Sequence, residues 1–267
     1  MNHLLRSLAP ISESGWELLD QEARERLAPA LGARKLLDFT GPHGWEHSAT
    51  NLGRTTPAEA GPVPGVTARQ RRVLPLVELR AGFSISREEL RDADRGADDA
   101  DLAPLDRAAH QLAAAETAAV FGGYGDVLGG IAEASPHPEP ASGADPDDYA
   151  ARVAGSIELL LAAGIGGPYG LALGDGEYRR VTAATEVGGG YPLTRHLERI
   201  LGGPIVWAPG LTGSVVVSTR GGDFVFDCGQ DLSLGYDSHD ADFVHLYLEE
   251  SFSFHVATPE AAVALKP

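Results

Sequence analysis

The sequence predicts an α+β protein organised around one long strand and one long helix. Residues 243–257, FVHLYLEESFSFHVA, alternate apolar and polar side chains, and only Glu250 interrupts the apolar row. Such alternation is typical of a strand with one buried face. Residues 104–121, PLDRAAHQLAAAETAAVF, place alanine and leucine side chains on one helical stripe. We therefore expect this helix to cover the strand in an elongated molecule.

Composition sets limits on the function. The chain has 267 residues, 43% of them hydrophobic, which is enough for a sizeable core. It carries 38 acidic and 21 basic residues, so we expect no binding to nucleic acids or to anionic membranes. The single cysteine, Cys228, excludes an intramolecular disulfide and is expected to pack as a small apolar residue. The N-terminus lacks the apolar core of a signal peptide, which predicts a soluble cytoplasmic protein.

The first half of the chain predicts a helix, a short strand and an extended arm. Apolar spacing indicates a helix over 14–31, with Ser12 or Ser14 as its cap. A short strand is expected over 34–39. Residues 48–72 are rich in proline and glycine and poor in apolar side chains, although their flanks look like strands. We interpret them as a two-stranded arm that needs a surface on a neighbouring subunit.

The second half predicts an inserted α/β unit. A Pro- and Gly-rich stretch over 131–145 marks a boundary. The elements expected after it are a helix from 145 to Gly164, a strand over 169–173, helices near 175–184 and 193–201, and strands over 205–208 and 214–219. The expected division is a discontinuous domain over 1–47, 77–130 and 224–267, an arm over 48–76, and an inserted domain over 131–223.

No sequence pattern predicts catalysis or a cofactor. Residues 231–235, DLSLG, match only the second half of a Gly-x-Ser-x-Gly elbow, and the GYG at 123–125 lacks the third glycine of a dinucleotide fingerprint. The acidic residues within 92–101 do not fit the register of a calcium-binding loop. His43 and His47 could share a metal, yet no helix aligns them, so we expect no metal site.

Seven segments spread over nearly the whole chain form a recognisable set. They are LLRSLAPISESGWELLDQEA, ALGARKLLDFTGPHGWEH, PLVELRAGFSISREEL, GGPYGLAL, YPLTRHLERI, STRGGDF and GQDLSLGYDSHDADFVHLYLEESFSF. Together they resemble the encapsulin shell proteins, formerly named linocin-type bacteriocins. The resemblance implies the major-capsid fold of tailed bacteriophages, with a peripheral domain, an axial domain and an extended loop. It also implies an icosahedral homo-oligomer, in the smallest case of roughly sixty copies.

The resemblance further implies a nanocompartment that encloses a cargo enzyme, such as a dye-decolorising peroxidase or a ferritin-like protein. The implied positions for binding a cargo peptide are Leu5, Leu8, Ile11, Arg34, Asp38, Asp231 and Leu234. An intrachain ion pair is the alternative role for Arg34 and Asp38. The implied pore loop consists of Glu186, Val187, Gly188, Gly189, Gly190 and Tyr191, for which a plain interhelical loop is the alternative. A soluble cytosolic hydrolase or protease, or a bacteriocin-like protein, is the rival class.

Overall fold

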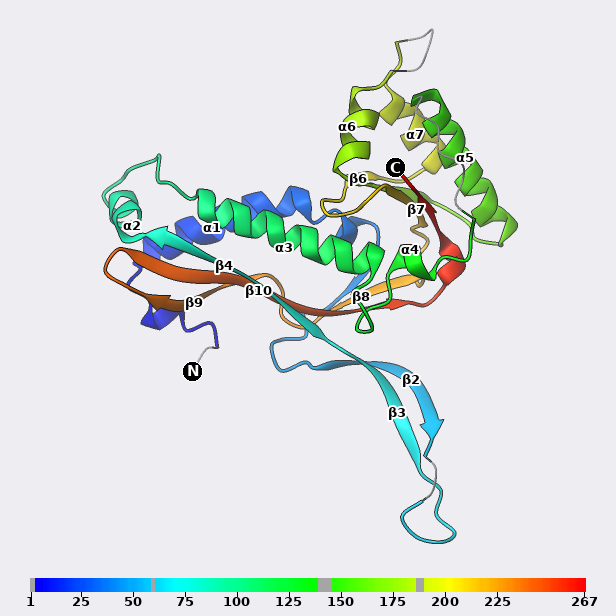
Figure 1. Ribbon diagram of the computed structural model, residues 1–267, viewed down its shortest axis with the longest axis horizontal. Helices are drawn as coiled ribbons and strands as arrows, with labels where there is room; N and C mark the ends of the chain where they lie inside the picture. The colour runs from blue at the N-terminus through cyan, green and yellow to red at the C-terminus, as the bar shows by residue number, and fades with distance from the viewer. Residues whose placement is uncertain (1–2, 59–60, 139–145, 186–189) are drawn as a thin grey trace.

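A computed structural model of the chain describes residues 3–58, 61–138, 146–185 and 190–267. Two long helices lie along a five-stranded sheet, a two-stranded arm projects away from the rest of the chain, and a second domain is built on a four-stranded sheet (Figure 1). The protein is elongated, as the sequence indicates.

The helices are α1 (Glu13–Ala30), α2 (Arg87–Asp94), α3 (Ala103–Gly122), α4 (Ile131–Ala134), α5 (Pro146–Ala162), α6 (Asp175–Ala183) and α7 (Leu193–Leu201). The strands are β1 (Asp38–Thr40), β2 (Ala49–Pro57), β3 (Arg69–Pro75), β4 (Val77–Ser86), β5 (Tyr169–Leu173), β6 (Ile205–Trp207), β7 (Ser214–Ser218), β8 (Phe224–Cys228), β9 (Ser233–His239), β10 (Phe243–Val256) and β11 (Ala262–Leu265). Short 3₁₀ turns lie at Arg6–Leu8, Ala33–Lys35 and Pro259–Ala261.

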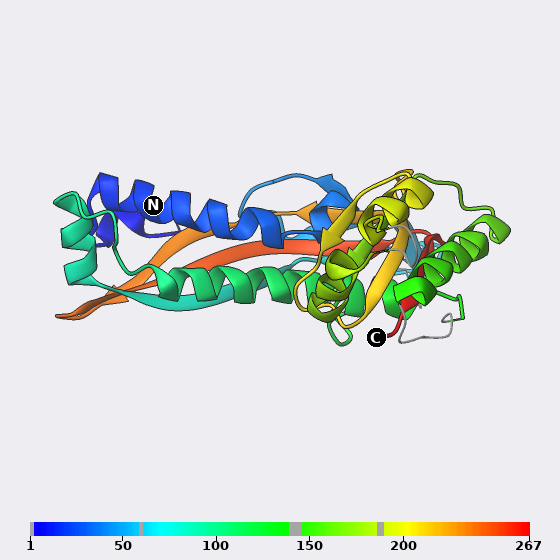
Figure 2. The ribbon, with the colours of Figure 1, turned by 90° about the horizontal axis from the view of Figure 1, so that it is seen from above.

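Strand β10 is the centre of the first sheet. The strand order is β1-β8-β10-β4, and β9 also pairs with β10. The longest pairing is antiparallel, between β4 and β10, and extends from Phe243 opposite Ser86 to Phe252 opposite Val77. Figure 2 shows α1 and α3 running side by side along the length of this sheet. The expected long strand and the helix that covers it are both confirmed.

Both faces of β10 are buried over its middle, so the prediction of one exposed face is wrong there. Tyr247, Glu249 and Ser253 belong to the polar row of the strand, yet each is at least nine-tenths buried. Strand β4 and the connection between β8 and β9 supply the cover. The Arg80 guanidinium lies 3.4 Å from the centroid of the Tyr247 ring, and the Gln230 amide donates to Glu249 at 3.3 Å. The alternation of apolar and polar residues within the strand could not predict this burial, because the covering side chains come from distant segments of the chain.

Helix α1 begins where its capping serine predicts. The Ser12 hydroxyl accepts the Gly15 N–H at 2.9 Å and so satisfies one free donor of the first turn. Ser14 does not act as the cap; its hydroxyl donates to the Asp94 carboxylate at 2.9 Å. This contact joins the start of α1 to the end of α2.

The strand expected over 34–39 begins later than predicted. Residues 33–35 form a 3₁₀ turn, and β1 starts at Asp38, parallel to β8. The turn places Ala33 and Leu36 three residues apart on one side, and both are buried in the core. Burying these two side chains together favours the turn over an extended strand.

The arm is the antiparallel pair β2 and β3. Its register runs from Ala49 opposite Pro75 to Pro57 opposite Arg69, with an irregularity next to Gly53. None of the described residues of the two strands is buried. The two-stranded arm predicted from the sequence is therefore present, and it is exposed on this isolated chain.

The second sheet has the order β11-β7-β5-β6. Its β5 and the neighbouring helix α7 have the predicted bounds. The last strand, β11, pairs antiparallel with β7, from Ala262 opposite Val217 to Leu265 opposite Ser214. The chain's final segment thus completes the second sheet, whereas the sequence analysis groups it with the first region.

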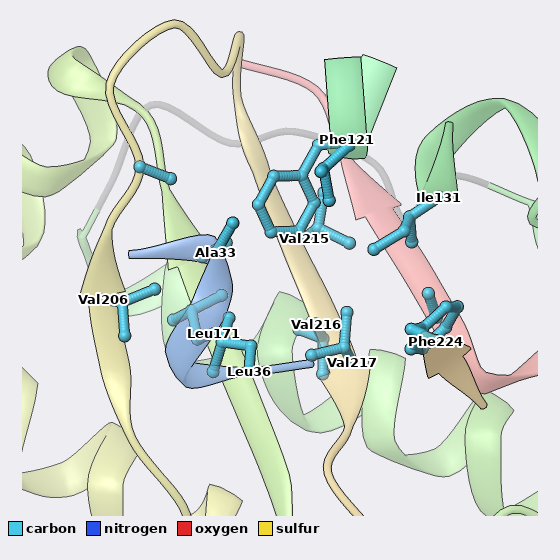
Figure 3. Packing of buried hydrophobic residues seen from close by; sticks show 14 of the residues in the cluster. Ala33, Leu36, Phe121, Ile131, Leu171, Val206, Val215, Val216, Val217 and Phe224 are labelled. Carbon is cyan, nitrogen blue, oxygen red and sulfur yellow. The ribbon is translucent and has the colours of Figure 1, made fainter. Parts of the chain in front are cut away.

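The apolar core connects the two domains. Figure 3 shows Phe121 from α3, Ile131 from α4 and Phe224 from β8 next to Val215 and its neighbours in the second sheet. Cys228 is buried in this cluster, as expected for a small apolar residue, and burial raises the pKa of its thiol to about 12. In the described parts of the chain, no helix combines the length and apolar character needed to cross a membrane.

Candidate peptide groove and family

A groove of about 510 Å³ runs along α1 on the side facing the start of β9. One wall is the helical stripe formed by Ala23 and Leu27, which are four residues apart, followed by Leu31. Leu234 contributes to the opposite wall, and Leu248 of β10 is also part of the lining. The groove therefore combines these aliphatic side chains with the charged side chains of Arg6, Asp20, Arg24, Arg34 and Asp231.

Arg34 lies at the groove and is held by three carboxylates of its own chain. It donates to Glu116 at 2.8 Å, to Asp231 at 2.7 Å and to Glu250 at 2.7 Å. Burial lowers the pKa of the guanidinium, but the three carboxylates outweigh it, so the net shift is upward. The Arg34 charge is fixed in place at neutral pH.

The carboxylates around Arg34 differ in exposure. Glu116 and Glu250 are fully enclosed, whereas the Asp231 side chain is 47% exposed. Burial, and next the negative charge of Glu116, raise the pKa of Glu250 well above its ordinary value. Asp231 is therefore the member of this network that a ligand in the groove can reach.

The N-terminal segment borders the groove as well. The Tyr236 N–H donates to the Leu4 carbonyl at 2.9 Å, which attaches this segment to β9. Arg6 forms a two-pronged pair with Asp20 of α1, at 3.1 and 2.8 Å, and stacks over the Trp16 ring. These contacts attach Leu4 to β9 and Arg6 to α1, the helix that forms one wall of the groove.

The predicted cargo-binding positions separate into two groups. Arg34, Asp231 and Leu234 line the groove together. Leu5 and Ile11 are half-buried against the core, and Leu8 is 59% exposed outside the groove lining. Asp38 accepts the Gly222 N–H at 2.6 Å and borders a separate, smaller hollow.

An intrachain ion pair between Arg34 and Asp38 does not form, because Arg34 pairs with Glu116, Asp231 and Glu250 instead. Sequence reasoning missed Leu4, Arg6, Leu27 and Leu31 as lining residues. The available signal was the stripe on α1, but a stripe on a helix also fits ordinary core packing.

The predicted pore loop is described only in part. Glu186, Val187, Gly188 and Gly189 lie outside the described residues. Gly190 and Tyr191 are exposed, and Thr185 forms an antiparallel bridge with Pro192. The described flanks thus come together at the base of the loop between α6 and α7.

Among the described residues, one group of side chains has the composition of a metal site, although the sequence predicts none. His43 and His47 lie with their ring centroids 4.6 Å apart, and both contact the Asp227 carboxylate. No helix aligns them; their loop is instead fixed to β8 by backbone hydrogen bonds, including the His43 N–H to the Cys228 carbonyl at 3.0 Å.

The comparison with known proteins decides the family. A family model described as "Encapsulating protein for peroxidase" matches residues 1–253. The chain belongs to this encapsulin family. A type 1 encapsulin shell protein of Rhodospirillum rubrum is 44% identical over 100% of this chain and 97% of its own length. Type 1 encapsulin shell proteins of Mycolicibacterium paratuberculosis and Brevibacterium linens are 41% and 40% identical, each over 99% of both chains.

Solved structures show the same fold at low sequence identity. A virus-like particle from Pyrococcus furiosus superposes with a TM-score of 0.64 and 19% identity, covering 92% of this chain and 98% of that one. The capsid of an empty GTA particle gives a TM-score of 0.52 and 17% identity, covering 89% of each chain. The major-capsid fold expected from the sequence is confirmed. The encapsulin relatives are structural shell proteins, so the rival prediction of a hydrolase or protease is wrong.

Proposed function

We propose that copies of this chain assemble into the closed icosahedral shell of a cytoplasmic bacterial nanocompartment, with roughly sixty subunits in the smallest case. The observation that carries this proposal is the arm of β2 and β3, which extends from a capsid fold without a buried residue in either strand. A two-stranded hairpin has little stability of its own in water. Contacts with a neighbouring copy would provide the missing cover.

The proposed domain roles follow the same scheme. The first sheet with α1 and α3 forms the peripheral domain, and the second sheet with α5, α6 and α7 forms the axial domain. The loop over 186–191 would then line a pore.

Replacement of Gly188–Gly190 by bulky residues should slow the entry of small ions into loaded shells, and unchanged entry would contradict this role.

Within the shell, we assign the groove along α1 to the targeting peptide of a cargo protein, for which a dye-decolorising peroxidase and a ferritin-like protein are the candidates. Its aliphatic walls suit the apolar side chains of a short peptide. Asp231 is half-exposed at the groove, where it can accept hydrogen bonds from the peptide. Leu5, Leu8, Ile11 and Asp38 stay a prediction for contacts beyond the groove.

A charge placed in the groove tests this assignment. Ala28 is exposed and lines the groove, so Ala28→Glu should fold normally while placing a carboxylate against the peptide. We expect peptide binding to weaken by about 1.4 kcal/mol or more, which corresponds to an at least about tenfold higher dissociation constant for the peptide. Gln21→Glu adds the same charge on α1 outside the groove lining and is the matched control.

The measurement is the ratio of co-expressed cargo to shell protein in purified particles, with each of the two cargo classes tested separately. We expect intact shells from both variants and depleted cargo only in Ala28→Glu. If shells of the two variants contain the same amount of a given cargo, that cargo does not bind in the groove.

A further inference from the structure

The base of the arm brings together three side chains with metal-ligating chemistry. The His43 Nε2 lies 2.8 Å from one Asp227 carboxylate oxygen, and the His47 Nε2 lies 3.3 Å from the other. Each of the three residues has one possible ligand atom that lies within 4.8 Å of those of the other two. Two imidazoles thus converge on one carboxylate.

This arrangement is fixed by segments distant in the sequence. Asp227 lies on β8, and the loop that carries both histidines connects β1 to β2. The His43 and Gly44 N–H groups donate to the Cys228 and Gly229 carbonyls at 3.0 and 2.8 Å. The loop therefore follows the end of β8 and holds the histidines without a helix.

Two threonine hydroxyl groups also hydrogen-bond to the Asp227 carboxylate. Thr40 donates to one Asp227 oxygen at 2.8 Å, and Thr50 at the start of the arm donates to the other. Outer-shell bonds of this kind orient ligating carboxylates.

The distances suit a small divalent cation. Bonds of about 2.0–2.1 Å to zinc in a tetrahedral site separate neighbouring ligand atoms by roughly 3.4 Å. The carboxylate–imidazole separation at His47, 3.3 Å, matches that value, whereas the 2.8 Å at His43 is a hydrogen-bond distance that would have to lengthen by about 0.6 Å when the ion binds. The His43 side chain is 45% exposed and that of His47 is 28% exposed, so solvent reaches the site and water can complete the coordination.

We propose that His43, His47 and Asp227 form a zinc site at the base of the arm. One zinc ion would take the place of the two Nε2 protons directed at the carboxylate, and each neutral imidazole would then carry its proton on Nδ1. Zinc matches a set of two imidazoles and one carboxylate better than calcium or magnesium, which prefer oxygen ligands. Bound there, the ion would link the loop over 41–47 to β8 next to Thr50, where the arm leaves the first sheet.

The test is zinc binding by the purified full-length chain without a histidine tag. ZnCl₂ is titrated in competition with a chromophoric zinc chelator. We expect one tight site per subunit in the wild type and at least about tenfold weaker binding in the double variant His43→Gln with His47→Gln. Both side chains are partly exposed, so this variant should fold.

The double variant His137→Gln with His245→Gln removes the same number of imidazoles elsewhere and should bind zinc like the wild type. Asp227→Asn, monitored by circular dichroism for folding, should also weaken binding. Titration with Co²⁺ should give the visible absorption of a low-coordinate site only where His43 and His47 are present.

The proposal is overturned if the wild type takes up no stoichiometric zinc. It is equally overturned if the His43 and His47 variant binds zinc as tightly as the His137 and His245 control. Because binding is measured per subunit whatever the oligomeric state, this result is independent of whether the chain forms a shell.

Discussion

Replacing Arg34 with alanine is expected to lower the free energy of unfolding by about 3–5 kcal/mol, because it removes the cation from an enclosed ion network. Glu116 and Glu250 would then face each other without a counter-charge, and an oxygen of each already lacks a hydrogen-bond partner among the described residues. The measurement is the midpoint of urea unfolding. Arg26→Ala is the control, since Arg26 pairs with Glu22 and Asp106 on the surface and should contribute little.

The loss of stability caused by Arg34→Ala should increase with pH. Burial and Glu116 raise the pKa of Glu250 above its ordinary value of 4.5, although the Arg34 charge lowers it. Arg34→Ala removes this lowering influence, so the folded chain of the variant holds the Glu250 proton even more tightly than the wild type does. The free-energy cost of ionising Glu250 in the folded chain is absent below its pKa in the unfolded chain. This cost grows as pH rises through its pKa in the folded chain. Arg34→Ala should therefore be more destabilising at pH 8 than at pH 5.

A compensating variant separates this explanation from simple loss of packing. Adding Glu116→Gln and Glu250→Gln to Arg34→Ala removes the unpaired charges and should recover much of the stability, with little remaining pH dependence. If Arg34→Ala unfolds at the same urea concentration as Arg26→Ala, the network does not stabilise the fold as described.

Shortening the arm should abolish closed shells while leaving the subunit folded. Arg54 and Arg72 lie directly opposite each other in the arm, so residues 55–71 can be replaced by an Asn-Gly turn that suits a two-residue hairpin loop. None of the described residues removed belongs to the buried apolar core, so the fold should survive. Circular dichroism reports the fold, and size-exclusion chromatography with negative-stain electron microscopy reports assembly.

A matched variant keeps both strands of the arm. Thr55→Ala with Arg69→Ala removes a 2.8 Å side-chain bond within the arm but leaves the backbone pairing. It should still give closed particles. Normal particles from the shortened chain would show that the arm is not needed for assembly.

The sequence predicts best the elements whose signals are local. The bounds of β5 and α7 follow from their apolar runs, and the structure shows that Gly202, with a φ of 71°, ends α7. The long strand β10 follows from alternation over many residues. The strand near 34–39 was misplaced because Ala33 and Leu36 are buried by tertiary packing, which no local pattern records.

The sites depend on contacts between distant segments, and sequence reasoning recovers them only in part. Arg34 is separated by 82 residues from Glu116 and by 216 from Glu250, so neither partner could be inferred from spacing. His43 and Asp227 are 184 residues apart, which is why a metal-ligating cluster was not expected. Arg34, Asp231 and Leu234 came from family resemblance, and the structure adds the α1 stripe that completes their groove.

Negative-stain electron microscopy of the purified full-length chain, expressed without cargo, tests the central claim most directly. The shell function predicts closed, uniform, hollow particles built from this chain alone. A monodisperse monomer or small oligomer under the same conditions would contradict it, because the capsid fold would then be present without the assembly that we propose.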